Sequence, residues 1–188
     1  MKFNSDKGLS LIELLATLAI ISMVATISAG SFTWLIERSS ASTTRSNIEQ
    51  TFSLARYIAV TEQTIVTICP LDSAQKCTNN WSLPTAVFRD PTNTLELMNS
   101  ELHVKSVTLP AGGSLTPSNS FNGPRKHFQY GPDGSVRGTI GNFTWCPKSG
   151  NAKSAIHVRI NFGGRLTWSQ DSDGNDIVET ANRTDVSC

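Results

Sequence analysis

The feature that most constrains this chain is an uncharged stretch of 23 residues, 14–36, near its amino terminus. About 20 predominantly apolar residues in a helix are enough to cross the hydrocarbon core of a bilayer. Lys2 and Lys7 precede the stretch. The positive-inside rule therefore predicts that the short leader stays cytoplasmic and that the rest of the chain faces the other side. Glu13 stands directly before the uncharged residues, where a carboxylate is costly and usually marks a function with a partner nearby.

Two simpler explanations of this segment leave Glu13 unexplained. A secretory signal peptide has an apolar region of about 7–15 residues and then a cleavage site of small residues. The apolar stretch here is longer, and a conventional signal peptide would not tolerate Glu13 in its apolar region. A plain membrane anchor, with the Glu13 side chain reaching the interface, is the alternative, but such an anchor would gain nothing from the carboxylate.

The residues KGLSLIELL, at 7–15, resemble the class III leader of type IV pilins and type II secretion pseudopilins. In that family a prepilin peptidase cuts after the glycine, which is Gly8 here. The new first residue, Leu9, is then N-methylated, although phenylalanine is more usual there, and the fifth residue is a glutamate, here Glu13. The resemblance implies that Glu13 pairs with the cationic amine of Leu9, on its own or a neighbouring subunit. Such a pair would set the register of packed helices.

A helical pattern continues beyond the apolar stretch. Residues 37–60 contain no glycine or proline, and their apolar positions recur with helical spacing. These positions are Ile48, Phe52, Leu54, Ala55, Ile58 and Ala59. The pattern predicts an amphipathic face that packs on a sheet. We therefore expect one long helix from about residue 9 to residue 59, as the pilin resemblance also implies, with its second half as the spine of a globular domain.

Short strand-like runs follow the helix and are separated by Gly, Pro and Asn turns. They lie at 64–70, 86–90, 102–109, 126–130, 135–140, 143–147, 155–162 and 165–170. The predicted fold class is α+β: a long N-terminal helix, membrane-spanning in its first half, packed on an antiparallel, two-sheet, β-rich domain. The expected divisions are a leader at 1–8, a transmembrane or filament-core helix at 9–36, an amphipathic helix at 37–62 and a globular domain at 63–188.

Motifs in the globular part resemble the GspH/FimT family of minor pilins and pseudopilins. They lie at 53–77, at 128–136 (FQYGPDGSV), at 143–147 (FTWCP) and at 163–165 (GGR). The sequence WSLP, at 81–84, departs from the family, in which a glycine commonly follows the tryptophan. The resemblance implies a minor subunit of a type IV pilus, at the tip or in a priming complex. A type II secretion pseudopilin is the alternative, because both machines use this leader.

The same resemblance implies where the protein lies and what it meets. The expected partners are other pilins or pseudopilins, through the N-terminal helix, and the prepilin peptidase. The expected location is the inner membrane, crossed once, with the globular domain in the periplasm, and then the pilus or pseudopilus.

Four cysteines lie beyond the apolar stretch, at Cys69, Cys77, Cys146 and Cys188. An even count in a domain carried across a membrane favours disulfides. A zinc site is less well supported, because the chain has no CxxC pair. The sequence leaves three pairings open. In the layout of the family, Cys69–Cys77 would close a small loop and Cys146–Cys188 would hold the carboxyl terminus to the strand region.

Residues 124–165 carry seven basic side chains against one acidic side chain, a local net charge of +6. Basic residues among aromatic ones can bind the phosphates and bases of DNA. Some FimT-type minor pilins bind DNA for uptake through a GRxR motif. Here Arg165 matches that motif, but Thr167 replaces its second arginine, and the tail after Arg165 has a net charge of −4. DNA binding for natural transformation is thus a further alternative, with Arg165, Arg159 and Lys153 as possible contacts. The simpler interpretation is that these charges form a solvated face, which keeps the domain soluble or meets a partner pilin.

Catalytic and metal motifs are missing from the sequence. His103, His127 and His157 all lie in strand-like runs, and none belongs to an HExxH, GxSxG or paired metal spacing. The stretch DSDGND, at 171–176, begins like a calcium loop, but Asp176 and Asn182 stand where an EF-hand needs Gly and Glu. We expect a turn with exposed acids there, and we predict no enzyme activity, no cofactor and no metal site.

Overall fold

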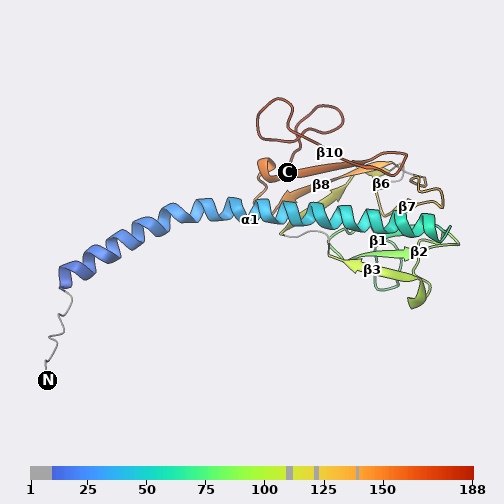
Figure 1. Ribbon diagram of the computed structural model, residues 1–188, viewed down its shortest axis with the longest axis horizontal. Coiled ribbons are helices and arrows are strands. Elements are labelled where there is room, and N and C mark those ends of the chain that lie inside the picture. Colours follow the sequence, from blue (N-terminus) through green and yellow to red (C-terminus); the bar gives the residue numbers. More distant parts are fainter. Residues whose placement is uncertain (1–9, 109–111, 121–122, 139) are drawn as a thin grey trace, which may run out of the picture. The chain divides into compact units, whose positions relative to one another are not determined.

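The computed structural model describes residues 10–108, 112–120, 123–138 and 140–188, without the side chains at 26–31. Its contacts divide the chain into two units, Met1–Ile36 and Glu37–Cys188. Helix α1 (Leu11–Thr61), 51 residues long, runs through both units (Figure 1). The predicted long helix is therefore confirmed over the described residues, and it continues two residues past its expected end.

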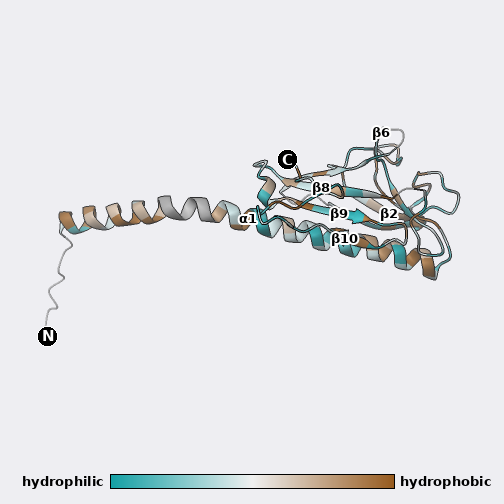
Figure 2. Ribbon diagram, turned by 90° about the horizontal axis from the view of Figure 1, so that it is seen from above, coloured by the Kyte–Doolittle hydropathy of each residue, from teal (hydrophilic) through white to brown (hydrophobic). Residues whose placement is uncertain are grey.

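The first unit, as far as it is described, consists of the beginning of α1. Its side chains from Ser10 to Ala25 are exposed, and Figure 2 colours most of this stretch as hydrophobic. Among the described residues, no helix is long and apolar enough to cross a membrane. The membrane-spanning part of the helix predicted at 9–36 is thus not confirmed; residue 9 and the side chains at 26–31 lie outside the described residues.

The second unit carries two four-stranded sheets in which every pairing is antiparallel, as predicted. The first sheet has the order β3-β2-β1-β7, formed by β1 (Val66–Pro70), β2 (Thr85–Arg89), β3 (His103–Val107) and β7 (Phe128–Tyr130). The second has the order β10-β9-β8-β4, formed by β4 (Gly113–Pro117), β8 (Gly141–Pro147), β9 (Ile156–Ile160) and β10 (Leu166–Trp168). A small ribbon pairs β5 (Asn119–Ser120) with β6 (Gly123–Pro124). Two 3₁₀ turns complete the described elements, η1 (Ser100–Leu102) and η2 (Ala152–Ser154).

The core of the second unit lies between α1 and the two sheets. The predicted helix face is buried, with Ile48, Phe52 and Ala55 at most 1% exposed. The Phe52 ring makes edge contacts with Phe128 of the first sheet, at 5.5 Å between centroids, and with Phe143 of the second sheet, at 5.9 Å. Phe52 is therefore the point at which the helix joins both sheets. Aromatic packing of this kind stabilises more than the buried area alone.

Two strand expectations differ from the structure. The described residues of the run at 135–140, which are 135–138 and 140, form no strand. Ser135 instead donates hydrogen bonds to Asp133 from its amide (3.0 Å) and its hydroxyl (2.8 Å), and Val136 adds a single bridge to Tyr130. Conversely, β4 was not predicted from its sequence, GSLTP, in which Leu115 is the one buried residue. Pairing with β8 makes this segment a strand, and its proline stands at the strand end, as edge strands allow.

Candidate functional site

The start of α1 is a nearly uniform apolar surface with one carboxylate. Leu11, Ile12, Leu14 and Leu15 are between 52% and 78% exposed, and Glu13, also exposed, lies among them in the first turn. The amide of Glu13 donates to the carbonyl of Ser10 at 3.0 Å, which is part of the helix start. Exposed apolar surface of this extent marks a region that is covered by other molecules. The predicted cleavage residues, Gly8 and Leu9, lie outside the described residues, so the structure does not place them against Glu13.

The second unit begins with a carboxylate that ties α1 to the sheet domain. Glu37 accepts hydrogen bonds from the Ser154 hydroxyl at 2.8 Å and from the Asn151 amide at 3.3 Å, at the turn η2. Hydrogen bonds from Ser149, Ser154 and Asn151 lower the pKa of Glu37, although burial opposes this. The sequence reasoning missed this tie, because Glu37 and its partners are more than 100 positions apart.

All four cysteines are in disulfides, paired as Cys69–Cys77 and Cys146–Cys188. Their Cα atoms lie 5.5 Å and 5.6 Å apart, within the usual range for a disulfide. This is the pairing that fits the family layout. The first bond closes a short loop after β1, and the second fixes the last residue of the chain to β8.

The three basic residues considered for DNA contact are not gathered into one described site. Arg165 is exposed and lines a pocket between α1 and β10 together with Glu49 and Arg56. Arg159 lines other pockets, and Lys153 pairs with Asp176 at 3.1 Å between Nζ and Oδ2. An ion pair lowers the availability of Lys153 for phosphate. Contact with DNA therefore stays a prediction.

The glycine before Arg165 has a clear structural role. Gly164 has a positive φ of +76°, which favours glycine, and a Cβ there would lie 2.6 Å from the carbonyl oxygen of Gly134. Its own carbonyl accepts a hydrogen bond from the buried Tyr130 hydroxyl at 3.0 Å. Burial raises the pKa of Tyr130 to about 12, so this hydroxyl remains a donor at neutral pH. The GGR motif thus joins the end of β9 to the first sheet.

The acidic residues near the carboxyl terminus form a turn held by its own carboxylates. Oxygen atoms of Asp171, Asp173 and Glu179 lie within 4.8 Å of one another. Asp171 accepts hydrogen bonds from the amides of Gly174 (2.7 Å) and Asp176 (2.8 Å), and these bonds lower the pKa of Asp171. The carboxylate of Glu179 likewise accepts a hydrogen bond from the Ser172 hydroxyl at 2.6 Å. The segment is a hydrogen-bonded turn in which Asp171 and Asp173 are exposed.

The histidines have separate environments. His157 is buried at 2% exposure, with its Nδ1 atom 2.7 Å from the Ser169 hydroxyl. His103 is partly exposed, with Nε2 2.8 Å from the Ser106 hydroxyl, and His127 is partly buried. Burial, followed by the charge of Arg159, lowers the pKa of His157. These side chains lie in three different strands or their flanks, and His157 is the most deeply buried of the three.

A long helix packed on an antiparallel, two-sheet domain defines the pilin-like fold class. The type IV minor pilin FimU of Pseudomonas aeruginosa shares this fold, with a TM-score of 0.55 and 14% identity over 72% of this chain and 92% of FimU. The minor pseudopilin EpsH of the type 2 secretion system of Vibrio cholerae aligns with a TM-score of 0.46 and 14% identity over 69% of this chain and 95% of EpsH. No curated protein sequence matches the chain.

Family models identify the chain from its sequence. The model described as type II transport protein GspH matches residues 44–164, which is more than half of the chain. The prokaryotic N-terminal methylation motif matches residues 3–29. The chain therefore belongs to the GspH family. This family and its fold are those of structural pilin and pseudopilin subunits, not of known enzymes.

Proposed function

We propose that this protein is a minor subunit of a type IV pilus, added at the tip or in a priming complex. Before assembly it is held in the inner membrane with its globular domain in the periplasm, cut after Gly8 by the prepilin peptidase, and methylated on Leu9. The observation that carries this proposal is the exposed apolar start of α1, where Glu13 is the one charged residue from Leu11 to Ile36. The methylation motif that overlaps this helix supports it.

The proposed mechanism is assembly by helix burial. Apolar side chains such as Leu18 and Ile21, which are 55% and 62% exposed, would be covered by the helices of neighbouring subunits. Burial of apolar surface contributes about 25 cal/mol per Å², so several such residues supply a large driving force. A lone carboxylate in that setting needs a cation, and the new amine of Leu9 is a suitable one. Glu13 would therefore select the register in which the two charges meet.

The variant Glu13→Ala tests the register role. We expect the variant to insert into the membrane normally and to be lost from sheared filaments, because the partner amine would be buried unpaired. Glu101→Ala, at an exposed acidic residue of η1, is the matched control and should incorporate normally. Immunoblots of the membrane and filament fractions measure both steps. Normal incorporation of the Glu13 variant would remove the register argument.

Replacement of Gly8 by a bulky residue tests the proposed cut. Gly8→Leu should leave a precursor that keeps its leader, whereas the unaltered chain should begin with a methylated Leu9. Intact-mass spectrometry of the membrane-extracted protein distinguishes the two forms. A mature-sized chain from the Gly8 variant would refute the assigned cleavage point.

A pseudopilus of the type II secretion system is the second candidate, and the description of the matching family favours it. The two candidates differ in what a clean deletion removes. Loss of surface pili with normal enzyme secretion would support the pilus, whereas normal pili with failed secretion would support the pseudopilus. Pilus counts and secreted-enzyme activity are measured on the same cultures.

A further inference from the structure

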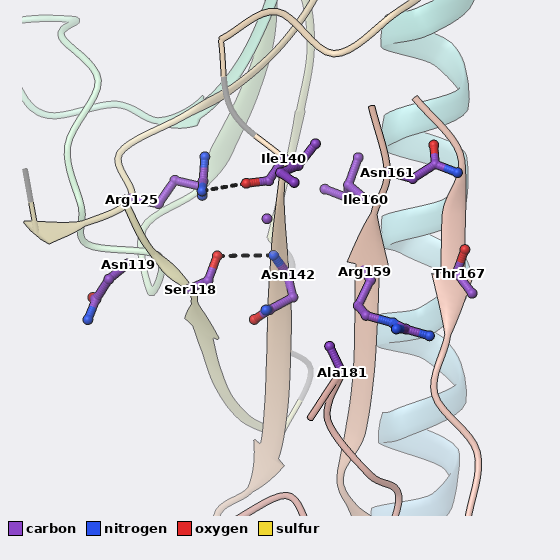
Figure 3. Close-up of a pocket in the computed structure, with 11 residues that line it drawn as sticks. Ser118, Asn119, Arg125, Ile140, Asn142, Arg159, Ile160, Asn161, Thr167 and Ala181 are labelled. Atoms are coloured by element: carbon purple, nitrogen blue, oxygen red, sulfur yellow. Dashed lines mark hydrogen bonds between the residues drawn. The ribbon is translucent and has the colours of Figure 1, made fainter. Parts of the chain in front are cut away.

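A polar pocket lies on the face of the second sheet that points away from the core. Asn142, Arg159 and Thr167 are directly opposite one another on β8, β9 and β10, so their side chains share one face. Phe143, at the alternate position of β8, is buried in the core. The pocket has a volume of about 470 Å³, which is within the usual range for small-molecule sites. Figure 3 shows its lining side chains, which come from β5, β8, β9 and β10 and from the segments beside them.

One wall of the pocket is formed by a buried cation. Arg125 is 3% exposed, and its Nη2 donates to the carbonyl of Ile140 at 2.8 Å, as the dashed line in Figure 3 marks. The guanidinium crosses β8 at Gly141, where a Cβ would lie 2.7 Å from its Nε atom. It also lies 4.9 Å from the ring centroid of Phe128. Gly141 therefore makes room for a fixed positive charge at the pocket edge.

A second cation enters the pocket from β9. The Nε atom of Arg159 is buried and has no hydrogen-bond partner within the described chain, nor does Arg159 form an ion pair there. Glu179 borders another pocket that Arg159 lines, but its carboxylate accepts bonds from the Ser172 amide at 2.9 Å and 3.0 Å and from its hydroxyl. No Asp or Glu is among the described residues that line the pocket of about 470 Å³. A partly desolvated guanidinium without a counter-ion favours an anionic ligand.

The remaining polar groups of the pocket are neutral. The carboxamides of Asn119 and Asn142 make no hydrogen bond with other described side chains. Thr167 is an exposed residue on β10, on the other side of Arg159 from Asn142. The Ser118 hydroxyl accepts a hydrogen bond from the backbone amide of Asn142 at 3.1 Å. Carboxamides and hydroxyls both donate and accept, which suits the hydroxyl groups of a sugar. The described lining includes no helix N-terminus, the usual holder of a phosphate.

We propose that this pocket binds a sugar acid, with its carboxylate on Arg159 and its hydroxyls on Asn142 and Asn119. Arg125 adds a second positive charge. A neutral sugar has no carboxylate and therefore cannot make the charge-assisted contact with Arg159. The inference goes beyond the assembly role and does not depend on it. The ligand could be a free monosaccharide or a terminal residue of a polysaccharide, since the same carboxylate and hydroxyls are present in both.

The test is calorimetric titration of the full chain in detergent with glucuronate, galacturonate and a short oligogalacturonate. Glucose, acetate and inorganic phosphate are the comparison ligands. We expect saturable binding of at least one sugar acid and no comparable binding of the three comparison ligands. A gain in affinity for the oligomer over the monomer would identify a polysaccharide end as the source, and equal affinity would identify the free sugar.

Variants assign the binding to the pocket. Arg159→Gln should weaken binding by about tenfold or more, because it removes one charge-assisted contact. Asn142→Asp should abolish binding, since the new carboxylate would pair with Arg159 across the strands. Arg165→Gln, at an exposed arginine of another pocket, is the matched control and should bind normally. Thermal unfolding of each variant checks that the fold is retained.

Four results would contradict the binding of a sugar acid in this pocket. The proposal fails if no sugar acid binds, or if glucose binds as well as glucuronate. It also fails if phosphate or a DNA oligonucleotide displaces the sugar acid with equal affinity, because the pocket would then be a general anion site. An equal loss in the Arg159 and Arg165 variants would place the binding elsewhere.

Discussion

The two halves of α1 have the same backbone conformation but opposite surroundings. In the first unit, Leu18 is 55% exposed, whereas in the second unit Phe52 is 1% exposed and contacts both sheets. One helix therefore serves two purposes. Its second half obtains its stability from the domain that it belongs to, and its first half presents apolar surface that must be covered by something else.

The largest expected effect comes from comparing the two halves directly by substitution. Phe52→Ala should lower the free energy of unfolding by about 3–5 kcal/mol, because it opens a cavity between helix and sheets. Leu18→Ala should change it by less than about 0.5 kcal/mol in the solitary chain, since that side chain is exposed. The same Leu18 variant should nevertheless reduce incorporation into filaments. Urea unfolding measures the free energy of unfolding of both variants. Equal destabilisation by Phe52→Ala and Leu18→Ala would contradict the difference between the two halves of the helix.

The disulfides should give the next largest effect, and one confined to the second unit. Removing Cys146–Cys188, which spans 42 positions, should cost about 4 kcal/mol on chain-entropy grounds, and removing Cys69–Cys77, which spans 8, should cost about 2.6 kcal/mol. Paired Cys→Ser variants and their unfolding midpoints measure the two costs. A larger loss from the shorter loop would show that strain or packing, rather than loop closure, decides the order.

The smallest expected effect is a pH dependence of the second unit. Burial lowers the pKa of His157 below its ordinary value of 6.5, and burial lowers the pKa of His127 in the same direction. The unfolded chain then binds more protons, so stability is complete above about pH 6.5 and falls as the pH drops through the folded pKa. The lowered pKa values of Glu37 and Glu179 act below about pH 4.5, outside this range.

His157→Gln should reduce the stability lost between about pH 7.5 and about pH 5.5, because one of the two histidines with a lowered pKa no longer titrates. His103→Gln, at a partly exposed histidine, is the matched control. Unfolding midpoints at the two pH values measure the difference. An unchanged pH dependence in the His157 variant would show that other groups set it.

Periodicity and turn residues predicted the helix and most strands, because these features are written in neighbouring positions. The stripe containing Ile48, Phe52 and Ala55 predicted the buried face of α1 correctly. Prediction from the sequence was poorer for β4, which is a strand because it pairs with β8 and not because of its composition. It was also poorer after β7, where the Asp133 side chain accepts a hydrogen bond from the backbone amide of Ser135. These contacts depend on partners that a local pattern cannot include.

The sequence alone was enough to identify the N-terminal methylation motif, the apolar stretch with Glu13, the amphipathic half of the helix and the α+β class, because each rests on residue type and short spacing. The tertiary structure was needed to choose one of three disulfide pairings, to bring Glu37 to the turn at Ser154, and to separate Lys153, Arg159 and Arg165. It was also needed to place Arg125 and Arg159 at one pocket. Contacts between residues far apart in the chain are set by sheet pairing and side-chain packing, and these are decided when the whole domain folds.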